Sequence, residues 1–160
     1  MTATEAAALI HTVAAENGID PVLFEAICRV ESSLNQFAMR YEPKWNYLYF
    51  QREHAGQLGI TEETETQLQK FSYGLCQIMG SVAREHGYRG PLVALIADPA
   101  LCLKFGAIHL KKFLWKYQTE AEAIAAYNAG SARKTPGGMF VNQQYVDKVD
   151  KVLRQLRPLV

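Results

Sequence analysis

Apolar residues recur along most of the chain at the three- and four-residue spacing of helices, and no stretch alternates for long enough to predict a useful strand. Local signals mark where the helices begin. A Thr-x-x-Glu capping box stands at Thr2 and again at Thr119, and an Asp-Pro pair, which suits the first turn of a helix, stands at Asp20 and Asp98. The pattern therefore predicts an all-α chain.

The helices predicted from this pattern cover residues 2–17, 21–33, 61–70, 74–87, 100–117, 119–130 and 142–156. The segment 39–70 is more polar than its surroundings, and a short hairpin fits inside it. A chain of 160 residues is long enough for one domain with a sizeable core. We therefore expect a single all-α domain over residues 1–160.

Glu31 stands on the apolar side of the second predicted helix. With about 100° per residue and Glu31 at zero, Phe24 lies at about +20° and Ile27 at about −40°. Glu25 and Arg29 lie near 120° and 160°, on the other side, where they can pair in water. A buried carboxylate that keeps its proton is what a general acid requires, but a structural Glu that pairs at the edge of the core explains the position equally well.

The amino-acid composition argues against several classes of protein and of site. Hydrophobic residues make up 49% of the chain, too many for a disordered protein, and a net charge of +1 argues against nucleic-acid binding. The cysteines, Cys28, Cys76 and Cys102, show no metal-ligand or redox spacing, and the four histidines are scattered. We expect Cys28 and Cys102 to be buried thiols, and we expect neither a metal nor a cofactor.

The N-terminal stretch is not typical of a secretory signal, because no basic residue precedes its apolar part and Glu5, His11 and Glu16 interrupt it. No apolar run approaches the roughly 20 residues needed to span a membrane. We therefore expect a protein made in soluble form in the cytoplasm, with no integral membrane segment.

Three further fragments carry polar or aromatic groups at or near predicted helix ends. They are Ser72, Gly74, Leu75 and Gln77 at the start of one predicted helix, Tyr127 and Asn128 at the end of another, and Tyr145 in the last helix. Taken singly, each has an ordinary explanation as a helix cap, a solvated side chain or a core residue.

Taken in order, however, these fragments resemble the soluble lytic transglycosylase family of peptidoglycan-cleaving enzymes. The family signature is Glu-Ser, then Gly-Leu-Met-Gln, then Ala-Tyr-Asn-x-Gly, then Tyr-Val in the final helix. The matching positions are Glu31-Ser32, Gly74-Leu75-Cys76-Gln77, Ala126-Tyr127-Asn128-Ala129-Gly130 and Tyr145-Val146. The resemblance spans about Pro21 to Leu153.

The resemblance implies a lysozyme-like α fold, as in goose-type lysozyme. It also implies cleavage of the MurNAc–GlcNAc β-1,4 bond of peptidoglycan with formation of 1,6-anhydro-MurNAc ends, with Glu31 acting as acid and then as base. The same resemblance assigns a substrate site to Ser32, Ser72, Gly74, Leu75, Gln77, Tyr127, Asn128 and Tyr145, in which Tyr145 hydrogen-bonds the catalytic carboxyl.

Two departures from the family pattern stand out. Cys76 replaces the usual Met, and we expect little effect because both are soft apolar side chains. The interval from Glu31 to Gly74 is 43 residues (74 minus 31), longer than in many relatives. Its aromatic cluster, which includes Trp45 and Tyr47 together with Tyr49 and Phe50, suits either a lobe over the glycan groove or a small satellite core.

A glycosidase that adds water normally needs two carboxylates, and the sequence offers no convincing second one. The acidic residues that we considered are Glu42, Glu53, Glu62, Glu63 and Glu65 in the polar segment, Asp98 as a helix cap, and Asp147 and Asp150 on a face expected to meet water. A transglycosylase is therefore favoured. The alternatives are a hydrolytic muramidase of the same fold and an inactive peptidoglycan-binding module.

Peptidoglycan lies outside the inner membrane, so a protein without a visible export signal needs a delivery route. We favour a phage-encoded enzyme, carried by the virion or released by a lysis system as an endolysin, and a bacterial secretion machine is the alternative. We expect a monomer that binds peptidoglycan glycan strands.

Overall fold

The computed structural model describes residues 1–157. Its elements, in chain order, are α1 (Ala3–Glu16), α2 (Pro21–Ser32), β1 (Met39–Tyr41), α3 (Gln51–Leu58), α4 (Glu62–Gln69), β2 (Phe71–Tyr73), β3 (Ile78–Met79), α5 (Gly80–Glu85), α6 (Ala94–Ala97), α7 (Pro99–Lys116), α8 (Glu120–Ala129) and α9 (Gln143–Leu156). The mostly helical class predicted from the sequence is confirmed.

The helix starts follow the local signals. The capping boxes at Thr2 and Thr119 both form, and the side chains of Asp20 and Asp98 each accept a backbone N–H in the first turn of α2 and α7. These interactions span no more than one helical turn, which is why the sequence alone placed these boundaries to within one or two residues.

The chain between β2 and α5 differs from the predicted helix at residues 74–87. β2 pairs antiparallel with both β1 and β3, so the hairpin lies at residues 71–79 and not inside 39–70, and α5 begins only at Gly80. Gly74 and Gln77 have φ angles of 67° and 49°. Because this left-handed conformation cannot continue a right-handed helix, the segment turns back on itself.

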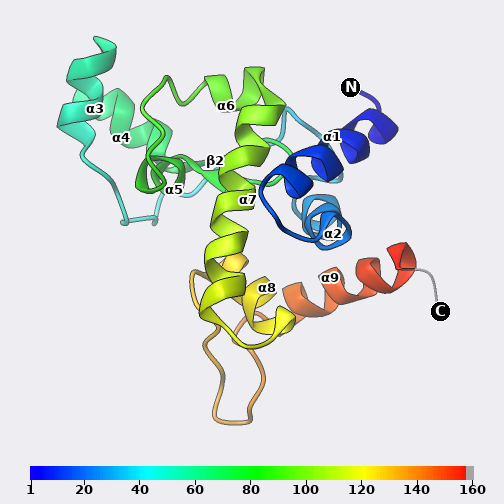
Figure 1. The fold of residues 1–160 in the computed structure, drawn as a ribbon. Coiled ribbons are helices and arrows are strands. Elements are labelled where there is room, and N and C mark those ends of the chain that lie inside the picture. Colours follow the sequence, from blue (N-terminus) through cyan, green and yellow to red (C-terminus); the bar gives the residue numbers. More distant parts are fainter. Residues whose placement is uncertain (158–160) are drawn as a thin grey trace.

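The core forms around α7, which Figure 1 shows running through the middle of the molecule. α1 and α8 pack on α7, while α2 packs on both α1 and α9. All three cysteines are buried, as expected for Cys28 and Cys102. This packing brings the C-terminal end of α2 to the start of α9, although more than a hundred residues separate them in the sequence.

Glu25 corrects one sequence expectation. Its pair with Arg29 forms at 2.7 Å, but Glu25 is only 5% exposed, because α1 packs across this part of α2. His11 of α1 places Nε2 2.6 Å from the other carboxylate oxygen. The prediction that Glu25 faces water is therefore wrong, and its carboxylate contacts two partners, Arg29 and His11.

The helices α3 and α4 pack on each other and project to one side of the molecule (Figure 1). The helix predicted at residues 61–70 forms as α4, and it is exposed on its outer face only. On its inner face, Glu65 and Arg84 have no exposed side-chain surface, and Arg84 donates two hydrogen bonds to the carboxylate, at 2.8 and 3.0 Å. This ion pair joins α4 to α5.

The aromatic cluster of the polar segment is divided. Trp45 packs against the core, and its indole N–H donates to Ser81 Oγ at 2.7 Å, whereas Tyr47 and Phe50 are 77% and 65% exposed.

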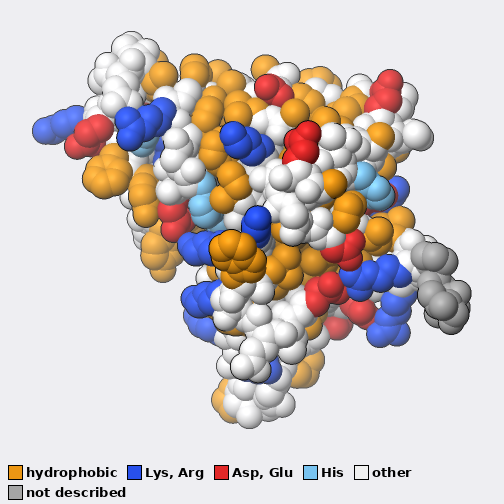
Figure 2. Space-filling view, viewed as in Figure 1, with side chains coloured by type: hydrophobic (Ala, Val, Ile, Leu, Met, Phe, Trp, Pro, Cys, Tyr) orange, Lys and Arg blue, Asp and Glu red, His pale blue; other side chains and the backbone are white. Residues whose placement is uncertain are grey.

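On the face seen in Figure 2, side chains of both charge signs are interspersed, in keeping with the small net charge. Within residues 1–157, no helix is long and apolar enough to cross a membrane.

Candidate active site

Glu31 lies in the last turn of α2, next to the point where the helix stops. Ser33 takes a left-handed conformation, with φ of 53°, and caps the helix. The hydroxyl of Ser32 donates to the carbonyl of Leu75 at 2.7 Å, which fixes the end of α2 against the turn between β2 and β3. The carboxyl group of Glu31 is thus held on a short, anchored helix end.

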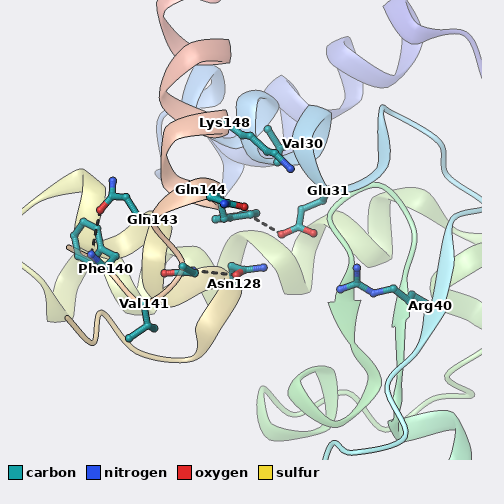
Figure 3. Close-up of a pocket in the computed structure, with 11 residues that line it drawn as sticks. Val30, Glu31, Arg40, Asn128, Phe140, Val141, Gln143, Gln144 and Lys148 are labelled. Carbon is teal, nitrogen blue, oxygen red and sulfur yellow. Dashed lines mark hydrogen bonds between the residues drawn. The ribbon is translucent and has the colours of Figure 1, made fainter. Parts of the chain in front are cut away.

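A cavity of about 510 Å³ opens in front of Glu31. Its lining residues come from the end of α2, from β1, from the end of α8, from the loop before α9 and from α9 itself: Val30, Glu31, Arg40, Asn128, Phe140, Val141, Asn142, Gln143, Gln144, Tyr145 and Lys148. Figure 3 shows most of these side chains arranged around the Glu31 carboxyl group. Within residues 1–157, Glu31 is the only carboxylate that lines this cavity.

Tyr145 contacts Glu31 directly. Its hydroxyl donates to Glu31 Oε1 at 2.7 Å, a contact between residues 114 positions apart. Burial raises the pKa of the Glu31 carboxyl group above its ordinary value, while the Tyr145 hydrogen bond and the positive charge of Arg40 act in the opposite direction. Burial also raises the pKa of Tyr145 well above its usual range, so Tyr145 keeps the proton that it donates.

Asn128 reaches the pocket from the exposed end of α8, where Gly130, with φ of 79°, closes the helix. Its Oδ1 accepts a hydrogen bond of 2.9 Å from Nδ2 of Asn142. Figure 3 shows its amide group beside the Glu31 carboxyl group. Glu31, Asn128 and Tyr145 are the predicted site residues that the fold brings together in one cavity.

Three other predicted site residues lie behind the pocket wall. Leu75 is fully buried, and the hydroxyl of the buried Tyr127 donates to the carbonyl of Cys76 at 2.8 Å. Ser32 donates to Leu75, as described above. These side chains support the end of α2 and do not line the cavity.

The remaining predicted residues are engaged with each other in the hairpin. Ser72 donates to Gln77 Oε1 at 2.8 Å, and Nε2 of Gln77 donates to the carbonyls of Ala38 and Gly74 at 3.0 and 2.9 Å. A Cβ atom at Gly74 would lie 2.8 Å from Cys102 Sγ. These contacts hold the hairpin against β1 and α7, and the glycan contacts predicted for these residues stay a prediction.

Sequence reasoning missed several residues of the pocket. Arg40 enters from β1 and Lys148 from α9, and Phe140, Asn142 and Gln143 lie just before or within the first turn of α9. Arg40 also pairs with Glu42 at 2.5 Å. No motif surrounds Arg40 or Lys148, and nothing in the sequence pattern at Asn142 indicated a role in the pocket.

None of the acidic residues considered as a second carboxylate lines this cavity. Glu65 is bound to Arg84 in the interior, the side chain of Asp98 caps α7, and Asp150 pairs with Arg154. Within residues 1–157, no group of three His, Cys, Asp or Glu side chains is placed to hold a metal ion.

The structure is thus a mostly helical domain in which one partly buried carboxyl group, that of Glu31, lies over a polar cavity. Comparison with protein families agrees, since the model of the transglycosylase SLT domain matches residues 8–138. The chain belongs to this family, whose lysozyme-like fold it has, and membership implies lytic transglycosylase activity on peptidoglycan. Comparisons with curated proteins and with solved structures found no match. Tyr145 lies beyond the matched residues and is placed in the site by the structure.

Proposed function

We propose that this protein cleaves the MurNAc–GlcNAc β-1,4 bond of peptidoglycan without water and leaves 1,6-anhydro-MurNAc ends. The observation that carries this proposal is the site itself. One partly buried carboxyl group, Glu31, receives a hydrogen bond from Tyr145, and no second carboxylate lines the described cavity. A hydrolase of either stereochemical type would normally place two carboxyl groups about the bond.

In the first step, Glu31 acts as the general acid. Its raised pKa keeps the carboxyl group protonated closer to neutral pH, so it can donate a proton to the oxygen of the leaving GlcNAc as the glycosidic bond breaks. The Tyr145 hydroxyl stabilises the carboxylate that is left behind. The N-acetyl group of the substrate's own MurNAc stabilises the positive charge that develops at C1.

In the second step, the same carboxylate acts as the base. It takes the proton from the C6 hydroxyl of MurNAc, whose oxygen attacks C1 and closes the anhydro ring. Glu31 is then protonated again, and no atom of solvent has entered the product. A single carboxyl group is sufficient for both steps because the proton that it gives to the leaving group is replaced by the one from the C6 hydroxyl.

The substrate-binding assignments follow from the positions of the residues. We assign direct glycan contact to Asn128, whose amide group faces the cavity. The other predicted binding residues, Ser32, Ser72, Gly74, Leu75, Gln77 and Tyr127, are assigned to the wall and the hairpin that hold Glu31 and border the groove.

The decisive experiment is digestion of purified sacculi in water enriched in ¹⁸O, followed by mass spectrometry of the muropeptides. We expect anhydro ends, lighter than reducing ends by one water and free of the heavy isotope. Glu31→Gln should keep the fold and lose turnover, because an amide cannot exchange the proton. Reducing muramic ends that carry ¹⁸O would instead show a muramidase, and binding to sacculi without any cleavage would show an inactive module.

The cell wall is the proposed place of action. A phage origin, with delivery by the virion or by a lysis system, is our proposal for how the enzyme reaches it. Co-sedimentation with virions and lysis of cells that co-express a membrane-permeabilising phage protein test the two routes. We also propose that the protein is a monomer with one catalytic domain, which light scattering on the purified protein tests directly.

A further inference from the structure

Asn142 occupies the cap position before α9 but does not cap the helix with its side chain. An Asn in this position ordinarily accepts a backbone N–H from the first turn. Here, Nδ2 of Asn142 donates to the carbonyl of Ala125 at 3.0 Å and to Oδ1 of Asn128 at 2.9 Å. Its Oδ1 is buried and has no hydrogen-bond partner within residues 1–157. The side chain therefore forgoes its usual role and leaves an acceptor unpaired, both of which cost stability.

The contact with Ala125 fixes which way the Asn142 amide group points. A backbone carbonyl can only accept, so the atom that faces it must be the amide nitrogen of Asn142. The same nitrogen meets Asn128, which must therefore present its oxygen to it. The amide nitrogen of Asn128 is then directed to the other side, into the cavity towards Glu31 and Arg40, as Figure 3 shows.

We propose that Asn142 is a positioning residue that holds the amide group of Asn128 with its two N–H donors facing the bound glycan. The inference rests on the proposed function and adds to it the chemistry of one contact between the protein and the glycan. The partner on the substrate is an acceptor oxygen, of the N-acetyl carbonyl or hydroxyl type, located beside the Glu31 carboxyl group.

This arrangement explains why an exposed Asn at a helix end can serve a binding site. Without Asn142, the Asn128 amide group could rotate by half a turn and present its oxygen to the substrate instead of its N–H donors. Fixing the orientation of the amide group on binding would then reduce the binding free energy. With Asn142 in place, the orientation is set before the substrate arrives by a chain of hydrogen bonds that begins at the backbone of α8.

The test separates binding from turnover. Equilibrium dissociation constants for a soluble GlcNAc–MurNAc tetrasaccharide are measured by calorimetry in the Glu31→Gln background, where no cleavage interferes, and kcat is measured with native Glu31. Asn142→Ser removes both donors but can still cap α9. Asn142→Asp keeps the shape of the side chain, and it replaces Asn142→Ser in the test if that variant folds poorly. Gln155→Ser, on an exposed part of α9, is the matched control.

We expect Asn142→Ser to weaken tetrasaccharide binding by about tenfold, the loss of one well-placed hydrogen bond, with Tm unchanged or higher and the control at the wild-type value. In an Asn128→Ala background the same substitution should have no further effect, because in this proposal Asn142 acts on the glycan through Asn128. Dissociation constants within twofold of the parent for both Asn142 variants, or an undiminished effect without Asn128, would overturn the inference. Absence of cleavage by the wild-type protein would instead contradict the proposed function, and the binding measurement would still decide the role of Asn142.

Discussion

The hydrogen bond from Tyr145 to Glu31 allows a quantitative prediction for Tyr145→Phe. The substitution removes one oxygen atom and leaves the ring in its place against the core. The lost contact is a 2.7 Å hydrogen bond to a carboxyl group that must become ionised during the reaction. Because the hydroxyl favours the ionised form, its removal raises the pKa of Glu31 further above the ordinary value.

The size of the effect follows from the type of hydrogen bond. A hydrogen bond to a charged, partly buried group contributes about 1.5–3 kcal/mol, and one pKa unit corresponds to about 1.4 kcal/mol. The pKa of Glu31 should therefore rise further above its ordinary value. The carboxylate formed after proton transfer loses the same stabilisation, so kcat should fall by about 10- to 100-fold. Binding of the glycan should change little.

The assay is the rate of anhydro-muropeptide release as a function of pH for the wild-type protein and the variant. A general acid is active below its pKa, so activity declines as pH rises through that value, and the alkaline limb of the Tyr145→Phe profile should move to higher pH. Tyr88→Phe is the matched control, since its hydroxyl donates to the carbonyl of Pro91 near the surface and away from the cavity. An unchanged kcat together with an unmoved alkaline limb would refute the reasoning and leave Tyr145 as a packing residue.

Three further predictions concern the fold and the chemistry. Burial lowers the pKa of His109 from 6.5 to about 3, so the unfolded state takes up the proton more readily. The contribution of His109 to the free energy of unfolding should therefore fall by about 1.4 kcal/mol per pH unit as the pH drops from about 6 to about 3, and urea titrations should find this contribution missing in His109→Leu. Gly106→Ala should destabilise the protein by about 1–3 kcal/mol in thermal unfolding, because its Cβ would collide with Cys76 Sγ, whereas Gly56→Ala, with open space around it, should stabilise α3. Activity should survive EDTA, and a loss that zinc or magnesium restores would show a missed metal site.

The sequence by itself determined most helix boundaries. The capping groups at Thr2, Asp20, Asp98 and Thr119 act on backbone atoms within one turn, so their effect is the same in any tertiary setting. The face of α2 that carries Glu31 followed in the same way, because the direction of a helical side chain depends only on its place in the helical repeat. This geometry singled out Glu31, and the resemblance to the family then implied its role as the acid.

Short-range patterns failed where a distant segment decided the outcome. The residues 74–79 have a helix-like composition, yet pairing of β2 with β3 and with β1 holds them in a turn and a strand. Glu25 and Glu65 look like surface charges in their own helices, and they are buried because α1 covers one and Arg84 of α5 binds the other. Burial of a charge requires a partner, and the sequence does not show where that partner comes from.

Only the tertiary structure decided which residues share the cavity with Glu31. Resemblance to a family indicated that Tyr145 meets Glu31, and the fold brings the two to 2.7 Å across 114 positions. Arg40, Asn142 and Lys148 had no such indication, because a single polar residue on a strand or helix end has many ordinary uses. Contacts between residues so far apart in the chain depend on how α2, β1, α8 and α9 pack against one another, and that packing is a property of the whole core and not of any one segment.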